Sequence, residues 1–527
     1  MDIGTISLIL LFGMLFLLAI GMPLGFASGF LAVVVMVLKF GPDLLFSSFG
    51  TGPLNVLAQR LYGITTNYVL ISVPLFIFMA TLLERSGIAR DMYSSLNMWL
   101  SRTRGGIAVV TALMAIVMAA MSGIIGGEVV LLGLIALPQM LRLGYNQNLA
   151  IGTICASGSL GTMIPPSIVL IFYGLITETS IHALFKAAFL PGFILAGLYI
   201  VYILVRTRLN PEEAPLPEPS AEDMTGRDKA VYGSALLALV TGGLALMFLV
   251  RGTFVVVTGQ VTEDMSYVST EALAGLAVYL AAALAYLALY IGPGRTKEAW
   301  DRGKGLIAPL LIVFVVLGSI YGGITGITEA AGIGSVAVLL LIIARKEFSF
   351  GLLREASMRT FRSTGTIIWV TFGATALAGA YTIAGGPTYV ANLIVGYELP
   401  TMGVILVMMI IFLFLGAFMD WTGIVLLVMP VFLPIVLKLP VAELGLTGGL
   451  ADQARLVSVW FGILFCVNMQ VSFLSPPFGP AAFYLKSVAP PHISLPDIFR
   501  GFLPFIGIQL VVLALILCVP EITTIFL

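Results

Sequence analysis

The sequence predicts an all-α polytopic membrane protein made of two inverted repeats, each with a re-entrant hairpin and a broken helix. The first observation behind this prediction is composition, because 59% of the 527 residues are hydrophobic, 10% are charged and the mean hydropathy is +1.09. A soluble domain has about 25% charged residues, so this chain belongs in a bilayer. The second observation is a duplicated motif, and the third is the distribution of Lys and Arg.

The duplicated motif interrupts one apolar segment in each half of the chain. Residues 154–173 and 465–484 align without a gap at an offset of 311 residues. The shared positions are a Cys, a Pro-Pro pair and a Phe-Tyr pair: Cys155 and Cys466, Pro165-Pro166 and Pro476-Pro477, Phe172-Tyr173 and Phe483-Tyr484. In a membrane, the backbone groups freed by such a break survive only beside other protein or a polar cavity. Paired breaks in two halves therefore indicate the binding site of a transporter.

The first repeat is expected to cover residues 1–208. Only Asp2 precedes its first apolar run and no basic segment does, which favours a retained membrane helix over a cleaved signal. The two halves of residues 105–141 have about 15 residues each, whereas a full span needs about 20, so a re-entrant hairpin fits better. The expected elements are two spans within 3–39 separated by Gly21-Met22-Pro23, an amphipathic stretch 40–69, a span at 70–84, a basic segment 85–104, the hairpin 105–141, a broken helix 148–176 and a span at 184–206.

Residues 209–304 separate the two repeats and are expected to hold an extended, solvated linker, 209–228, and two extra spans, 230–250 and 271–291. The second repeat is expected to cover residues 305–527. Its elements are spans at 305–321 and 325–344, a basic amphipathic piece 345–362, a span at 363–386, a hairpin at 401–438, a broken helix at 455–488 and a last span at 502–519. Thr328 is expected to cap a helix start beside Glu329.

The Lys and Arg residues test this arrangement of 12 crossings and two hairpins. With the N-terminus outside, the cytoplasmic segments hold all but six of the 26 basic residues, the exceptions being Lys39, Arg60, Lys186, Arg251, Lys438 and Arg455. The first repeat then begins outside and the second inside, so the repeats are inverted and both termini lie outside. Arg354, Arg359 and Arg362 are expected to form a cytoplasmic anchoring face, with substrate binding as the alternative.

Several classes of function are disfavoured by the same composition. The net charge is zero and no basic tail is present, so nucleic acid is not an expected partner. Three Cys and two His, widely scattered, do not suit a disulfide framework or a Cys/His metal site. Neither a phosphate-binding loop nor a nucleophile with a base is recognisable, so we expect no enzyme.

A hairpin turn and a helix break in each half bring irregular backbone to the bilayer midplane. Exposed carbonyls there suit a hard cation such as sodium, while half-helix N-termini suit a carboxylate. The expected anion-binding residues are Pro165, Pro166, Ser167, Pro476 and Pro477. The expected cation ligands are Ser122, Gly123, Ser157, Ser159 and Thr162 in a first site, and Gly416, Asp420, Thr422, Asn468, Gln470 and Ser472 in a second. The alternative for any one Ser, Thr or Gly is close packing of helices.

Two acidic residues occupy corresponding places in the hairpins, since Glu128 and Asp420 each lie ten residues before a proline, Pro138 and Pro430. A carboxylate at that depth is costly and is by default functional. We expect Asp420 to stabilise the second cation site. For Glu128, a functional ionisable group and a partner for a neighbouring dipole are both open.

At this point the motifs resemble a known family. Gly21-Met22-Pro23, Thr328-Glu329-Ala330-Ala331, Ile164-Pro165-Pro166-Ser167 and Gly416-Ala-Phe-Met-Asp420 resemble the large membrane subunit, DctM-like, of tripartite ATP-independent periplasmic (TRAP) transporters. The resemblance covers residues 1–208 and 305–527. The chain departs from the family pattern at the first hairpin turn, which has Ser122-Gly123 where a serine-rich turn is usual, and in the insert 209–304.

The resemblance implies an elevator-type transporter in a bacterial inner membrane. A periplasmic binding protein would deliver a carboxylate, an organic or 2-oxo acid, and a small four-helix membrane subunit would brace this chain. Sodium at the two hairpin–break sites would drive uptake. The alternatives are a stand-alone sodium/dicarboxylate symporter of related fold, a proton-translocating subunit of a respiratory-type complex, and a membrane-embedded enzyme.

Overall fold

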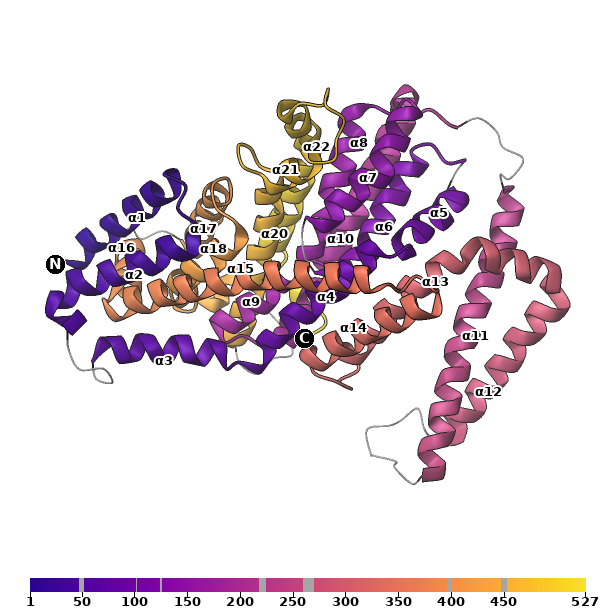
Figure 1. Ribbon diagram of the computed structural model, residues 1–527, viewed down its shortest axis with the longest axis horizontal. Helices are drawn as coiled ribbons and strands as arrows, with labels where there is room; N and C mark the ends of the chain where they lie inside the picture. The colour runs from indigo at the N-terminus through magenta and orange to yellow at the C-terminus, as the bar shows by residue number, and fades with distance from the viewer. Residues whose placement is uncertain are drawn as a thin grey trace.

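The structure is a computed structural model that describes residues 1–46, 52–100, 102–123, 126–217, 224–258, 270–395, 400–446 and 453–527. Every regular element in these ranges is a helix. The molecule is elongated, and one long helix, α15 (Phe350–Ile383), runs along its middle (Figure 1). The N-terminus lies at one end, and a projecting pair of helices lies at the other.

The first half forms ten α-helices: α1 (Ile3–Ala19), α2 (Leu24–Phe40), α3 (Pro53–Thr65), α4 (Ser72–Arg85), α5 (Ile88–Leu100), α6 (Gly106–Ser122), α7 (Gly127–Arg142), α8 (Gln147–Gly158), α9 (Ile168–Thr177) and α10 (Ile181–Leu209). Short 3-10 turns are η1 (Pro42–Phe46), η2 (Tyr68–Ile71) and η3 (Leu160–Thr162). The expected break between the first two helices is present, because Gly21 adopts a φ of +84° and Pro23 caps α2. Helices α6 and α7 form a helical hairpin within the expected residues 105–141, and α8 and α9 form an interrupted helix within the expected residues 148–176.

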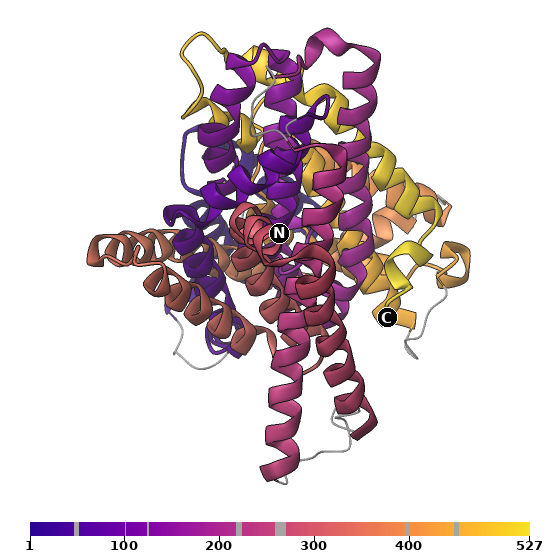
Figure 2. The ribbon, with the colours of Figure 1, turned by 90° about the vertical axis from the view of Figure 1, so that its right-hand side faces the viewer.

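The insert forms the projecting pair, which stands away from the rest of the molecule in Figures 1 and 2. Its helices are α11 (Gly226–Thr258) and α12 (Thr270–Ala285), the latter prolonged by a π-helical turn, Tyr286–Ile291. The start of the linker is exposed as expected but is not extended. It forms the 3-10 turn η4 (Pro211–Glu213), in which the Glu213 carbonyl accepts a 2.8 Å hydrogen bond from Asn146 N–H and the Glu213 carboxylate pairs with Arg206 at 2.5 Å. Residues 218–223 of the expected linker lie outside the described residues.

The second half adds α13 (Pro293–Tyr321), α14 (Ile327–Ala344), α15, α16 (Gly386–Val395), α17 (Thr401–Gly416), α18 (Trp421–Leu427), α19 (Met429–Val436), η7 (Val441–Leu444), α20 (Gln453–Leu474), α21 (Pro480–Lys486), α22 (Leu495–Cys518) and α23 (Glu521–Thr524). Two expectations were wrong here. The separate pieces 345–362 and 363–386 are one helix, because no proline interrupts residues 350–383. The cap of α14 is Gly326, so Thr328 lies inside the helix and donates instead to the Tyr68 carbonyl at 3.4 Å.

Within the described residues, nine helices are long and apolar enough to cross a membrane by length and composition. The sequence predicts 12 crossings. The difference comes from α1 and α2, which have 17 residues each, and from the segment that is split into α8 and α9. The start of α13 also differs from the expected 305, because Pro293 occupies the first helical turn after Gly292.

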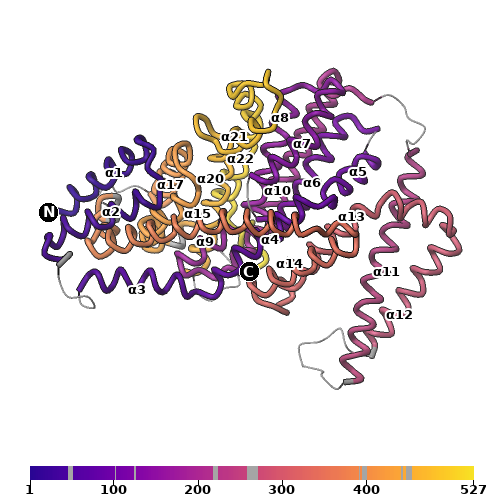
Figure 3. The backbone as a smooth tube through the Cα atoms, viewed as in Figure 1, coloured from indigo at the N-terminus to yellow at the C-terminus, as the bar shows by residue number. Residues whose placement is uncertain are grey.

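The two halves pack against each other reciprocally. Helix α8 lies against α22 while α20 lies against α10, and α7 lies against α21 while α18 lies against α9. Outside this core, α2 packs on α15 and α4 packs on α14. The tube in Figure 3 shows α20, α22, α8, α10 and α7 gathered in the middle of the molecule, with α1, α2 and α16 to one side. Reciprocal contacts of this kind are what a two-fold relation between two halves produces.

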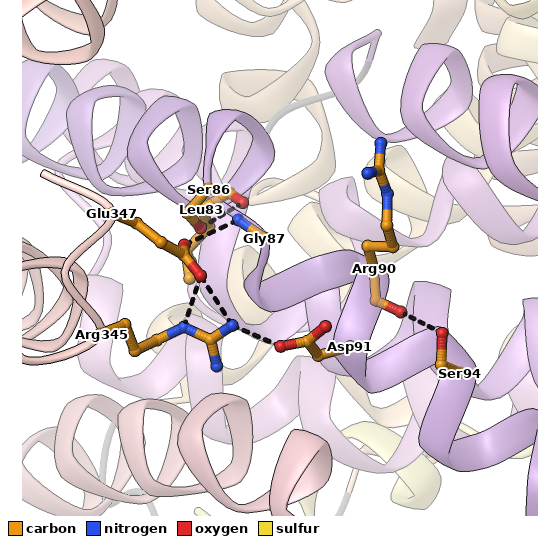
Figure 4. A network of polar contacts seen from close by, with 8 residues as sticks. All are labelled: Leu83, Ser86, Gly87, Arg90, Asp91, Ser94, Arg345 and Glu347. Atoms are coloured by element: carbon orange, nitrogen blue, oxygen red, sulfur yellow. Dashed lines mark hydrogen bonds and ion pairs between the residues drawn. The ribbon is translucent and has the colours of Figure 1, made fainter. Parts of the chain in front are cut away.

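A charged network joins the halves at the ends of α4 and α14 (Figure 4). Arg345 donates to Asp91 of α5 and, at 2.8 Å, to Glu347, whose other oxygen accepts from Gly87 N–H at 3.0 Å. Burial opposes the charge on Arg345, but the hydrogen bonds to Asp91 and Glu347 outweigh it and raise the pKa of the guanidinium. The network therefore fixes the α4–α5 turn against the α14–α15 connection.

Candidate functional site

The first break occupies residues 159–167, between α8 and α9. Ser167 caps α9, because its hydroxyl accepts from Leu170 N–H at 3.4 Å and donates to the Thr162 carbonyl at 2.5 Å. The Pro165-Pro166 peptide bond is cis. Every residue from 159 to 167 is buried, so backbone groups freed by the break are enclosed by protein.

The turn of the first hairpin lies on this break. Gly123 ends α6 with a φ of +61°, and its carbonyl accepts from Ile168 N–H at 3.2 Å. A Cβ atom at this position would be 2.3 Å from the Pro166 carbonyl oxygen. A glycine is therefore needed both for the left-handed backbone and for the close approach of the turn to the prolines.

The carboxylate of Glu128 lies beside the same turn and is almost fully enclosed, with 1% of the residue exposed. One of its oxygens accepts from the Ser122 hydroxyl, whereas the other, Oε2, has no hydrogen-bond partner. A buried acceptor without a partner is costly, which is typical of a position that a ligand or ion completes. Both interpretations of Glu128 therefore stay open, because Ser122 supplies a hydrogen bond to only one of its two carboxylate oxygens.

The second break occupies residues 475–479, between α20 and α21, and its Pro476-Pro477 peptide bond is also cis. Both prolines are exposed in the isolated chain. The second hairpin meets α20 just before this break, because a Cβ atom on Gly416 would be 1.9 Å from the Ser472 hydroxyl. Further along the hairpin, Thr422 donates to the Asp420 carboxylate, and Asp420 itself is exposed.

The two interrupted helices are joined by Gln470. Its amide nitrogen donates to the Ser159 carbonyl at 2.8 Å and to the Thr162 hydroxyl at 2.5 Å, while its amide oxygen accepts from the Ser159 hydroxyl at 2.7 Å. Ser159 and Gln470 are 311 residues apart and are thus counterparts in the duplicated motif. Residues that contact their own counterparts lie on a two-fold axis. Ser159, Thr162 and Gln470 therefore form one central cluster, although the sequence analysis divided them between two sites.

The pair Ser157 and Asn468 also has the offset of the duplicated motif, and each side chain has a buried oxygen without a partner. These atoms are Ser157 Oγ and Asn468 Oδ1, on residues that are 0% exposed. The amide nitrogen of Asn468 donates to the Met409 carbonyl at 2.9 Å, and the Ser472 hydroxyl donates to the Asn468 carbonyl at 3.2 Å. Equivalent unpartnered oxygens in the two interrupted helices, one at the end of α8 and one inside α20, are the arrangement that two cation sites of neutral oxygen ligands would need.

Each hairpin also reaches the interrupted helix of the other half. The ring of Trp421, at the start of α18, lies 5.9 Å from that of Phe172 in α9. On the other side, a Cβ atom on Gly126 would be 2.9 Å from the ring of Tyr484 in α21. The four segments that the sequence analysis singled out are thus in contact in one region.

Two charged residues near this region were not singled out as site residues. Arg359, expected to anchor the cytoplasmic face, lies with its Nη1 atom 2.8 Å from Oε2 of Glu84, whose side chain is only 11% exposed. One signal is present in the sequence, because the charged pair Glu84-Arg85 ends an apolar span. This pair does not reveal that the partner of Glu84 is Arg359, 275 residues further along the chain.

This fold and this site define a multi-pass membrane transport protein in which two helical hairpins contact two interrupted helices. The model of the family described as "Tripartite ATP-independent periplasmic transporter, DctM component" matches residues 11–522, and the chain belongs to this family. It is a large permease subunit of a TRAP transporter, as its sequence motifs predicted. Membership implies a small membrane subunit and a periplasmic binding protein as partners.

Relatives of known name support the assignment. The C4-dicarboxylate TRAP transporter large permease DctM of Pseudomonas aeruginosa is 26% identical over 94% of this chain and 92% of its own length. The sialic acid large permease SiaM of Vibrio cholerae is 23% identical over 97% of this chain and 96% of its own. The 2,3-diketo-L-gulonate large permease YiaN of Escherichia coli is 21% identical over 96% and 95%. These relatives are permeases and not enzymes, as expected for this chain.

A solved structure has a similar fold. The YdaH transporter of Alcanivorax borkumensis superimposes with a TM-score of 0.50 at 15% identity, over 94% of this chain and 96% of that one. At this identity the similarity concerns the fold alone. It supports the same overall fold over 94% of this chain.

Proposed function

We propose that this chain is the permease of a sodium-coupled uptake system for a carboxylate, supplied by a periplasmic binding protein. The observation that carries the proposal is the pair of equivalent buried oxygens without partners, Ser157 Oγ at the end of α8 and Asn468 Oδ1 inside α20. Sodium is a hard cation, and neutral hydroxyl, amide and carbonyl oxygens suit it. The residues available to hold it are those of the two predicted sets, with Gln470 joining the sets at the axis.

The substrate class follows from the relatives. The names of the three permeases described above give a C4-dicarboxylate, sialic acid and 2,3-diketo-L-gulonate, all of which carry a carboxylate. We propose an organic or 2-oxo acid for this chain. Cations bound beside the anion lower the cost of carrying its charge through hydrocarbon, which is a physical reason for coupling uptake to sodium.

We further propose an elevator motion in a bacterial inner membrane, with the hairpins re-entrant and both termini in the periplasm. The distribution of Lys and Arg supports this orientation. The motion is supported by an outer frame of α2, α4, α14 and α15, which pack on one another outside the hairpin-bearing core; in the proposed motion the core moves against this frame.

The test is uptake of labelled succinate, pyruvate and N-acetylneuraminate into proteoliposomes that hold this chain and its small subunit. A sodium gradient and the periplasmic binding protein are each supplied or withheld. Uptake that needs both is the expected result. Sodium-driven uptake without the binding protein would favour the stand-alone symporter, and uptake indifferent to sodium would contradict the coupling.

A further inference from the structure

A cavity of about 210 Å³ lies between the outer frame and the turn of the first hairpin. Its walls come from α4, α15, the start of α7 and α21. The residues that matter for its chemistry are Glu84, Gly127, Arg359, Ser363 and Tyr484. This volume is enough for a small organic acid and lies next to the first hairpin–break site, so its charges bear on what the protein transports.

The Glu84 carboxylate occupies one end of this cavity between two positive groups. Its Oε2 atom is 2.8 Å from Nη1 of Arg359. Its Oε1 atom occupies the space that a side chain at position 127 would fill, because a Cβ atom on Gly127 would be 1.8 Å from that oxygen. Gly127 is the first residue of the 16-residue helix α7, whose first N–H groups have no acceptor within the helix. The positive end of the helix and the guanidinium together favour an anion at this point.

Arg359 has N–H donors that its ion pair with Glu84 leaves available. Its side chain is 38% exposed and lines the cavity, whereas the Glu84 side chain is 11% exposed. A guanidinium has five N–H donors, of which one carboxylate takes at most two in a bidentate pair. Ser363 follows Arg359 by four residues on α15 and so lies on the same face of the helix, where its hydroxyl also lines the cavity.

We propose that this cavity binds the carboxylate of the transported acid, with Arg359 as its charge partner. When the acid is absent, the carboxylate of Glu84 pairs with Arg359 in its place. The proposal rests on the proposed function for its ligand, a carboxylate. The incoming acid displaces Glu84 from Arg359, while Ser363 and the Tyr484 hydroxyl are placed to bond its other polar groups. The empty cavity is thereby kept neutral, and the bound acid gains its counter-charge from the frame.

The experiment measures binding of the same three acids to the detergent-solubilised complex of this chain with its small subunit, so it needs no ion gradient. Glu84→Gln removes the competing charge and should lower the dissociation constant of the bound acid about tenfold, whereas Arg359→Gln should raise it about tenfold or more. The pair Arg85 and Glu355 supplies matched controls, because it joins the same two helices at 2.8 Å but is about half exposed and does not line the cavity. Glu355→Gln should leave the affinity unchanged.

The opposite signs separate a binding site from a structural ion pair. If Glu84→Gln and Arg359→Gln shifted the affinity in the same direction, or left it unchanged while lowering the unfolding temperature, the pair would be structural and the proposal overturned. Because binding is measured at one fixed sodium concentration and without a gradient, loss of sodium coupling in the uptake test would leave this result standing.

A second measurement covers the case in which either variant fails to fold. Ser363→Cys, in a Cys518→Ala background, places a thiol in the cavity wall, while Cys155 and Cys466 are buried. The acids should protect this thiol from a charged alkylating reagent. Glu355→Cys, on the same helix outside the cavity, should show no protection. Equal protection at both positions, or none at Ser363→Cys with any of the three acids, would overturn the proposal.

Discussion

The two breaks share their Cys and Pro-Pro sequence but differ in burial. In the first, residues 159–167 are all buried, and the hairpin turn at Gly123 covers Pro166. In the second, both prolines are exposed, and Phe478 is 57% exposed in the isolated chain. The contact of the second hairpin, Gly416 with Ser472, lies ahead of its break rather than over it.

This difference separates what a motif specifies from what its neighbours specify. The prolines and the freed backbone are local and are the same in both halves. Whether a break is covered depends on the position of the hairpin that packs on it. The first hairpin contacts its break at Pro166, whereas the second contacts Ser472, ahead of its break. Under the proposed elevator motion, two sites related by symmetry are expected to be unequally covered, since only one side is open at a time.

The largest expected effect concerns packing around the breaks. Ile164→Ala removes a side chain that is 1% exposed beside the first break and should lower the free energy of unfolding by about 2–5 kcal/mol. Phe478→Ala, in the second break, should change it by less than about 0.5 kcal/mol because that side chain is largely exposed. Thermal unfolding of the purified subunit measures both. Equal losses would show that the second break is covered in the purified subunit as well.

A smaller effect separates the two hairpin turns. Gly123→Ala should lower stability by about 1–3 kcal/mol, because the new methyl group meets the Pro166 carbonyl and φ is positive. Gly416→Ala should cost a similar amount, but there the obstructing atoms belong to the Ser472 side chain. Adding Ser472→Gly should therefore restore much of the loss for Gly416→Ala. In contrast, no side-chain substitution should rescue Gly123→Ala.

The smallest effect compares the two unpartnered oxygens. Ser157→Ala removes a hydroxyl without a hydrogen bond, so we expect little change in stability. The sodium concentration for half-maximal uptake should rise about tenfold, which corresponds to about 1.4 kcal/mol of sodium-binding free energy. Asn468→Ala should raise it similarly and also lower stability by about 1 kcal/mol, because it removes the bond to Met409.

Thr111→Val is the control for this comparison, since the Thr111 hydroxyl bonds to the Ile107 carbonyl of its own helix at 2.8 Å. It should leave the sodium dependence of uptake unchanged. A sodium response of Ser157→Ala equal to that of the control would remove Ser157 from the first cation site.

Much of the fold could be predicted because helices and their interruptions are decided locally. Apolar runs predict membrane helices, and Gly21-Met22-Pro23, Pro165-Pro166 and Pro476-Pro477 interrupt them where the structure has breaks. The continuity of α15 is not predicted, because the composition changes from basic to apolar between the expected pieces 345–362 and 363–386. Composition does not end a helix, and residues 350–383 contain no proline that would.

The sequence by itself determined the class of protein, the family, the places of the two breaks and the offset that relates them, because composition and proline positions act over a few residues. The tertiary structure alone decided that Gln470 bonds to its counterpart Ser159, that Arg359 meets Glu84, and that one break is covered while the other is open. The first two join residues 311 and 275 positions apart, and the cover of the first break joins Gly123 to Pro166 across 43 residues. Their approach depends on how whole helices of the two halves pack, which no local pattern encodes.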